Sequence, residues 1–299
     1  MNGELVPDPR IAAIQRARRI AAATLAKAIR EEAPKLSELS LCTRWGQLLA
    51  DHEELLSEGW YQPPPNGISA LIGTPPDFKR MSYVSLRHEA TWPRADITLG
   101  GNSIMYAYCS PVDRETKMIG DLGITLYNGA DSRIKDHLAA CFDITAQVAA
   151  YAEVGMELRE LYRFAADLID KAALANETFS TTDQSGGVDV GHTLPWSFNQ
   201  PTSEEQQALD SGDLLVIART ISDARHFLNA EEGQRILPTM GFTVEPRMAG
   251  PEYPLASFHV LVTFTDGVKR IHADFSELLD LFDMPSYLPR RALETLGCG

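Results

Sequence analysis

The order of predicted elements indicates an α+β fold for this chain of 299 residues. Apolar residues recur at steps of three and four in two N-terminal segments and in two segments near the middle, as in amphipathic helices. Short β-branched runs, separated by glycine or proline turns, follow each helix pair and indicate strands. Two batches of strands, each preceded by a helix pair, are typical of an α+β domain built from two similar halves.

The helices are the clearer signals. The first is predicted over 11–29 and stops before Pro34, and the second is predicted over 41–56 and stops before Gly59. The other predicted helices cover 132–154, 158–169 and 275–282.

The strands are short, and their turn signals define them. They are predicted at 96–99, 103–108, 124–127, 214–218, 242–245, 258–264 and 268–271. The runs that begin at Gly120 and Gly212 both read Gly-Asp-Leu, which suggests an internal duplication. Residues 61–95 are rich in proline and glycine turns and predict an irregular insertion that covers a pocket.

Composition and charge exclude several classes of function. Hydrophobic residues make up 44% of the chain and charged residues 23%, which excludes a largely disordered protein. The formal net charge of −14 argues against binding to nucleic acid or to anionic membranes, since both require clustered lysine and arginine. No apolar run is long enough to span a bilayer, and no apolar signal core follows Met1, so we expect a cytoplasmic protein. Four widely spaced cysteines predict free thiols: Cys42, Cys109, Cys141 and Cys298.

The common nucleotide-binding, zinc-protease and serine-hydrolase motifs are absent. Three other residues carry the clearest signals of a chemical role. His192 follows Gly191 in a loop, where an imidazole acts as a base or packs against Trp196. Glu245 ends an apolar strand, and the following proline restricts its backbone. Strand alternation predicts that His259 and Ser257 lie on the same face of a strand, where His259 would be a site residue. The alternative interpretation is a hydrogen-bonded histidine in the core.

The ordered motifs of the chain resemble the pita-bread metallopeptidase family of methionine aminopeptidase, prolidase, aminopeptidase P and the metal-free creatinase. The resemblance covers nearly the whole chain. Its motifs are Gly100-Gly101-Asn102, Gly120-Asp121-Leu122, Gly155-Met156-Glu157, Gly191-His192 and 241–246. It implies a curved antiparallel sheet in two pseudo-symmetric halves with helices on its outer side. It also implies a single domain over 1–299, without the N-terminal domain of prolidases, and a homodimer.

Most metal ligands of that family are missing here. The resemblance puts Leu126 at the first aspartate and Ser257 at the last glutamate, and the stretch with the second aspartate is deleted. His192 and Glu245 match the remaining two ligands. One imidazole and one carboxylate are too few for a two-metal site, so we expect no metal and no other cofactor. A different single-metal site built from Asp131, Asp189 and His259 is the alternative.

The resemblance therefore implies a metal-independent enzyme that acts as creatinase does, with histidine as acid–base. The predicted catalytic residues are His192, Glu245 and His259. The predicted substrate-binding residues are Trp196, Tyr106, Tyr108, Tyr127, Ser257 and Tyr61. The substrate would be a small organic, amide-containing or peptide-like molecule, and the reaction C–N hydrolysis or a lyase, isomerase or cyclase step in specialised metabolism.

Two other functions stay open at the level of sequence. The loss of three ligands also fits a non-catalytic pseudopeptidase that binds a peptide or a partner protein. A metal-dependent Xaa-Pro-type aminopeptidase fits if the motif positions are shifted by one or two residues.

Overall fold

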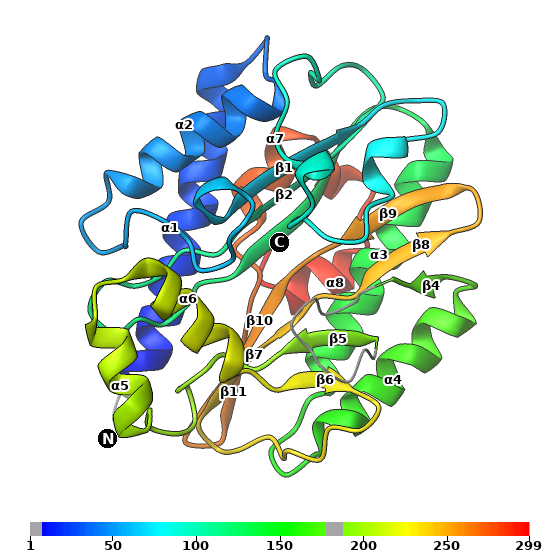
Figure 1. Cartoon of the computed structure of the whole chain (residues 1–299). Coiled ribbons are helices and arrows are strands. Elements are labelled where there is room, and N and C mark those ends of the chain that lie inside the picture. The colour runs from blue at the N-terminus through cyan, green and yellow to red at the C-terminus, as the bar shows by residue number, and fades with distance from the viewer. Residues whose placement is uncertain (1–7, 178–187, 299) are drawn as a thin grey trace, which may run out of the picture.

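A computed structural model describes residues 8–177 and 188–298 of the chain. The two longest helices, α1 (Pro9–Glu32) and α3 (Ser132–Tyr151), lie behind the strands in Figure 1. Helix α3 packs against the strands of the C-terminal half, and α1 lies against β3 of the N-terminal half. The strands therefore keep one side free of these two helices.

The N-terminal half contains a three-stranded antiparallel sheet in the order β1-β2-β3. These strands are β1 (Ile68–Gly73), β2 (Ser103–Cys109) and β3 (Leu122–Asn128). Strand β1 lies inside the segment 61–95, which the sequence predicts as irregular. That prediction is wrong for Ile68–Gly73, because the proline-rich turns on both sides of this short apolar run hid its strand character.

The C-terminal half holds three small antiparallel groups, in the orders β11-β10-β7, β4-β8-β9 and β5-β6. Their bounds are β4 (Ala175–Asn176), β5 (Asp189–His192), β6 (Phe227–Asn229), β7 (Met240–Val244), β8 (Arg247–Gly250), β9 (Tyr253–Ser257), β10 (Val260–Thr265) and β11 (Val268–His272). Single backbone bridges join Ile124 to Phe258 and Thr193 to Phe242. The first bridge therefore links β3 to the residue after β9, and the second links the residue after β5 to β7.

Local sequence signals start the long helices. Asp8 caps α1 by accepting a hydrogen bond from the Arg10 amide at 2.9 Å, and Pro9 occupies the first turn. Asp131 caps α3 in the same way. The remaining helices are α2 (Glu38–Ala50), α4 (Leu158–Lys171), α5 (Ser203–Asp210), α6 (Leu214–Asp223), α7 (Ser276–Leu281) and α8 (Arg290–Thr295).

Two predicted strands are wrong. Residues 214–218 begin helix α6, because the Asp213 carboxylate accepts hydrogen bonds from the Leu215 and Val216 amides and caps that helix. Only Ile217 and Ile221 of α6 are buried, at a helical spacing of four. Residues 96–99 form a single bridge at Thr98 instead of a strand. Since β3 and α6 differ in structure, the Gly-Asp-Leu repeat does not mark a duplication.

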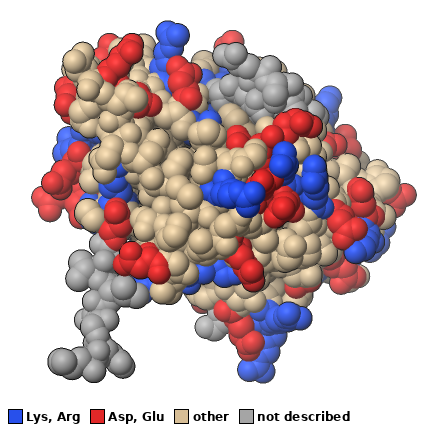
Figure 2. All heavy atoms as spheres, turned by 90° about the horizontal axis from the view of Figure 1, so that it is seen from below, with Lys and Arg blue, Asp and Glu red and all other residues tan. Residues whose placement is uncertain are grey.

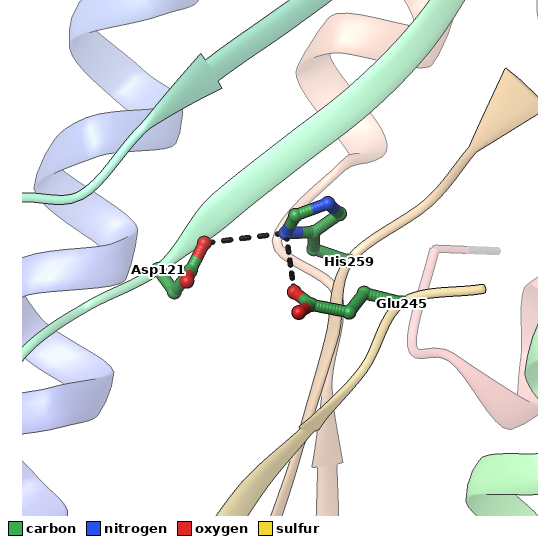
Figure 3. A group of neighbouring side chains, drawn as sticks. All are labelled: Asp121, Glu245 and His259. Atoms are coloured by element: carbon green, nitrogen blue, oxygen red, sulfur yellow. Dashed lines mark hydrogen bonds and ion pairs between the residues drawn. The ribbon is translucent and has the colours of Figure 1, made fainter. Parts of the chain in front are cut away.

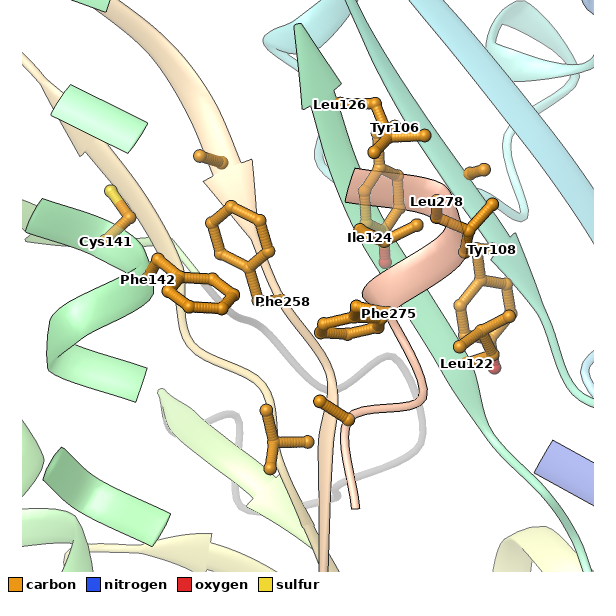
Figure 4. Close-up of a cluster of buried hydrophobic side chains, with 14 of the residues drawn as sticks. Tyr106, Tyr108, Leu122, Ile124, Leu126, Cys141, Phe142, Phe258, Phe275 and Leu278 are labelled. Carbon is orange, nitrogen blue, oxygen red and sulfur yellow. The ribbon is translucent and has the colours of Figure 1, made fainter. Parts of the chain in front are cut away.

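The larger hydrophobic core lies between α3 and the strands (Figure 4). Phe258 is fully buried there, with its ring centroid 5.1 Å from that of Phe142 on α3 and 6.4 Å from that of Phe275. Leu126 is also fully buried in this core. Phe258 therefore ties α3 to the short link between β9 and β10 that also carries the next residue, His259.

The surface carries charges of both signs. Figure 2 shows acidic and basic side chains of the described residues interspersed on one face, around a largely uncharged centre. No helix in the described part of the chain combines the length and apolar character needed to cross a bilayer. The prediction of free thiols is confirmed, since all four cysteines are unpaired and buried.

Truncation of the central aromatic contact should destabilise the fold. We expect Phe142→Ala to lower the free energy of unfolding by about 3–5 kcal/mol, because it leaves a cavity beside Phe258. Leu215, which is 72% exposed on α6, is the matched control, and Leu215→Ala should change stability by less than about 0.5 kcal/mol. Urea denaturation of both variants measures the difference, and equal effects would contradict this description of the core.

Candidate active site

Four ionisable side chains meet where strands begin or end, and we call them the His–carboxylate cluster. Asp121 directly precedes β3, and His192 is the last residue of β5. Glu245 directly follows β7, and His259 lies in the short link between β9 and β10. All four residues are buried. The cluster therefore gathers residues from four distant parts of the chain.

His259 contacts both carboxylates through one nitrogen. Its Nδ1 lies 3.2 Å from Asp121 Oδ1 and 2.8 Å from Glu245 Oε2. Figure 3 shows both carboxylates pointing toward this nitrogen. The other ring nitrogen, Nε2, lies 2.8 Å from the Tyr106 hydroxyl. Both nitrogens of His259 are thus held by protein groups.

His192 faces the same carboxylates from another strand. Its Nε2 lies 3.3 Å from Asp121 Oδ2 and 3.6 Å from Glu245 Oε1. Its Nδ1 lies 3.0 Å from the Thr193 carbonyl, and only a protonated nitrogen can donate to that oxygen. This bond fixes the ring orientation and leaves Nε2 as the nitrogen that exchanges a proton.

Burial and mutual attraction set the charges of the cluster. Burial alone would raise the pKa of Asp121, but hydrogen bonds from His192 and His259 lower it below its ordinary value. Burial likewise opposes ionisation of Glu245, but the nearby His259 and His192 lower the pKa of Glu245. Burial would lower the pKa of His259, but Glu245 and Asp121 raise it to about 9. At neutral pH the cluster thus holds two carboxylates and an imidazolium.

Aromatic rings surround His259. The Tyr108 ring centroid lies 5.6 Å from that of His259, and Tyr61 packs edge-on against Tyr108 at 5.6 Å. Tyr83 stacks on Tyr106 at 6.0 Å. Burial raises the pKa of Tyr106 and of Tyr108 well above the ordinary value, so both hydroxyls stay protonated.

A second group of rings lies beside His192. Trp60 and Phe227 present their rings at 6.4 and 6.2 Å from the His192 ring centroid. The Arg225 guanidinium lies 4.2 Å from the Trp60 ring and 4.9 Å from the Phe227 ring. Two aromatic rings and the Arg225 guanidinium that contacts them therefore flank the cluster on the side of His192.

The predicted site residues divide into two groups. Those in or beside the cluster are His192, Glu245, His259, Tyr106, Tyr108 and Tyr61. Tyr127 lies elsewhere, because its hydroxyl contacts Asn102 and the Asp131 amide about 20 Å along β3 from Asp121.

Trp196 and Ser257 are predicted substrate-binding residues that follow His192 and precede His259 in the sequence, but their side chains make other contacts. Trp196 belongs to the second hydrophobic core, together with Ile11 and Trp60, and its carbonyl accepts a hydrogen bond from Arg10. The Ser257 hydroxyl donates to the backbone carbonyl of Glu245 at 3.3 Å. Trp196 thus packs in the core, and Ser257 holds the backbone that carries Glu245.

Asp121 is the site residue that the sequence analysis missed. It entered only as part of a Gly-Asp-Leu motif, although it borders a buried strand just as Glu245 does. Leu126, placed at a ligand position by resemblance, lies in the hydrophobic core. Its neighbour Thr125 bonds the backbone of Ser257 instead, with Oγ1 3.0 Å from the carbonyl. The charged centre of this chain therefore lies at the start of β3.

The residues present do not fit a dinuclear metal centre, because a leucine and a backbone-bonded serine occupy two predicted ligand places. The proposed alternative set is not assembled either, since Asp131 caps α3 and Asp189 accepts a bond from the Gly191 amide. The only group of possible ligands found among the described residues is Asp121, Glu245 and His259, with donor atoms within 4.8 Å of one another. Three donor atoms are too few for more than one cation.

Several solved structures that superpose on this chain are peptidases. No protein-family model and no curated relative matches the sequence. A methionine aminopeptidase from Rickettsia prowazekii superposes with a TM-score of 0.60 at 14% identity, covering 90% of this chain and 98% of that chain. The chain has the pita-bread fold. The sequence-based prediction of an α+β pita-bread fold is thereby confirmed.

Longer pita-bread enzymes match as well. A dipeptidase and a prolidase, both from Pyrococcus horikoshii OT3, superpose with TM-scores of 0.61 at 13% and 12% identity, covering 89% and 88% of this chain. This chain spans 61% of the length of each of them. At such identities the likeness shows the pita-bread fold alone.

Gly123 makes room for His259, which yields a test of the cluster geometry. A Cβ added at Gly123 would lie 2.4 Å from His259 Cδ2, so we expect Gly123→Ala to displace the imidazole and to lengthen its contacts with the carboxylates. Gly101→Ala is the matched control, because a Cβ there meets open space. Crystal structures of both variants decide the point, and an unmoved ring in Gly123→Ala would contradict it.

The charge of His259 makes stability depend on pH. A raised pKa adds stability that is complete below the ordinary value near 6.5 and is lost as pH rises through about 9. We expect this loss to amount to roughly 1.4 kcal/mol for each unit of raised pKa. His259→Gln should remove this decline, whereas His226→Gln, at a half-exposed histidine, should keep it. Urea unfolding between pH 6 and 10 measures this, and parallel profiles for wild type and His259→Gln would contradict it.

Proposed function

We propose that this chain is a metal-independent enzyme that uses the His–carboxylate cluster for acid–base chemistry on a small organic or amide-containing molecule. The observation that carries the proposal is the fixed orientation of His192. Its Nδ1 is committed to the Thr193 carbonyl, and its Nε2 faces Asp121 and Glu245. Such a carboxylate-oriented imidazole is the arrangement that proton transfer requires.

The proposed roles follow from charge. His192 Nε2 gives a proton to the leaving nitrogen and recovers one from the attacking water or from the substrate. Glu245 and Asp121 orient His192 and favour the imidazolium that forms. His259, already cationic at neutral pH, stabilises negative charge that develops on the substrate. In a lyase, isomerase or cyclase step the same groups would move a proton without water.

The aromatic surroundings support a small substrate. Trp60 packs against His192 and Tyr108 against His259, and Tyr61 packs against Tyr108. Rings in this position suit a flat or apolar ligand whose single polar group reaches the cluster. The fold alone does not select the reaction.

A single-metal hydrolase is the second candidate, and the approach of three donor atoms to within 4.8 Å favours it. Metal-binding histidines commonly direct their outer nitrogen to a protein group, as His259 Nε2 does toward the Tyr106 hydroxyl. The contacts of His259 favour the metal-free enzyme instead. His259 Nδ1, which a metal would need as a ligand, already bridges both carboxylates at 2.8 and 3.2 Å.

Metal analysis and a substrate screen test the proposal together. The protein is purified without chelator, its metal content is measured, and turnover is followed on ureido, guanidino and amide compounds and on dipeptides. We expect far less than one metal per chain and turnover that a chelator leaves unchanged. One metal per chain with activity lost to chelator would establish the second candidate. Tight binding without any turnover would favour a pseudopeptidase.

The role of His192 gives the mutational test. We expect His192→Gln to lower turnover by about 10²-fold or more, because a general acid–base group is lost. His226→Gln is the matched control and should keep wild-type turnover, since His226 pairs with Glu232 at the surface. Initial rates on the best substrate of the screen measure both variants, and an active His192→Gln would remove His192 from the mechanism.

A further inference from the structure

One buried guanidinium connects the backbones of two cluster residues. Arg18 lies on α1 and is fully shielded from solvent. Its Nη1 donates to the Asp121 carbonyl, and its Nη2 donates to the His259 carbonyl at 2.5 Å. Nη2 also donates to the Ala273 carbonyl at 2.6 Å. A single planar group thus binds three segments far apart in sequence.

These bonds constrain the geometry of the cluster. Each carbonyl carbon is bonded to the Cα that carries the Asp121 or His259 side chain. The guanidinium is rigid and holds its donors in a fixed fork, so it sets the separation of the two backbones. The 3.2 Å contact between His259 Nδ1 and Asp121 Oδ1 depends on that separation.

The charge of Arg18 has its own partner, which separates its role from that of the cluster charges. Arg18 Nε lies 3.2 Å from Asp274 Oδ2, and the Phe275 ring lies 5.4 Å from the guanidinium carbon. Burial lowers the pKa of Arg18, and the Asp274 charge opposes that shift. The cationic form is therefore held without a direct contact to the carboxylates of the cluster.

The close approach of α1 to the start of β3 is a second, independent observation. A Cβ added at Gly120 would lie 2.3 Å from the backbone nitrogen of Arg18 and 2.6 Å from the Ala17 carbonyl carbon. Only glycine lets the strand lead pass so near to the helix. Gly120, the residue before Asp121, therefore packs directly against the turn of α1 that carries Arg18.

We infer that Arg18 is a positioning residue, which sets the spacing between Asp121 and His259 by clamping their backbones onto α1. The inference rests on the proposed function, because the spacing matters for activity only if the cluster is catalytic. Without the clamp, the His259 imidazole loses its alignment with Asp121 although every cluster side chain is still present.

The test compares Arg18→Met and Arg18→Lys with Arg16→Lys. Arg16 lies on the same helix but pairs with the partly exposed Glu54 and the buried Asp113, neither of which belongs to the cluster, so it serves as the matched control. The substrate-independent readout is the NMR signal of the His259 Nδ1 proton. We expect this signal to be lost in Arg18→Met, partly retained in Arg18→Lys and unchanged in Arg16→Lys. A wild-type signal in folded Arg18→Met would overturn the inference.

The kinetic readout uses the best substrate of the screen. We expect kcat to fall at least tenfold in Arg18→Met with KM changed less than threefold, and Arg18→Lys to recover part of kcat. Wild-type kcat in folded Arg18→Met would overturn the inference. If wild type turns over no substrate, the proposed function fails while the NMR result still decides the role of Arg18.

Gly120→Ala covers the case in which Arg18→Met does not fold. It keeps the guanidinium but forces the strand lead away from α1. We expect this variant to weaken the same His259 proton signal, and Gly101→Ala, whose added Cβ meets open space, to leave it unchanged. An unaltered signal in Gly120→Ala would overturn the inference.

Discussion

The need to neutralise buried charge governs the structure around the cluster. Two carboxylates, Asp121 and Glu245, are withdrawn from water, and each would be costly to bury alone. The imidazolium of His259 lies against both, and His192 approaches both from the end of β5. The segments that carry these four residues must therefore stay close enough for the imidazoles to balance the charge of the two carboxylates.

The short link between β9 and β10 places this charged centre directly beside the hydrophobic core. Phe258 and His259 are consecutive, and the first packs between Phe142 and Phe275 while the second bonds Asp121 and Glu245. Core packing thus fixes the backbone that carries a site residue. The charged cluster in turn tolerates little movement of that backbone.

The sequence was informative where a local signal marks a special backbone. His192, which follows a glycine, and Glu245, which precedes a proline, both lie in the cluster as members of the predicted catalytic set. Asp121 was missed because its role depends on strands that only the tertiary fold brings together. Tyr127 was predicted from its position beside Leu126, the ligand place given by the resemblance, and both residues lie in the hydrophobic core. Residues 214–218 were read as a strand because their apolar run is short and the capping role of Asp213 was overlooked.

The central claim is that protons rather than a metal ion occupy the cluster, and NMR of ¹⁵N-labelled imidazoles tests it most directly. Spectra are recorded at pH 7 before and after addition of one equivalent of Mn²⁺. The account predicts that His259 carries protons on both nitrogens and that the signals of His192 and His259 keep their positions and widths. Selective loss of these two signals through paramagnetic broadening, with the other histidines unchanged, would contradict it.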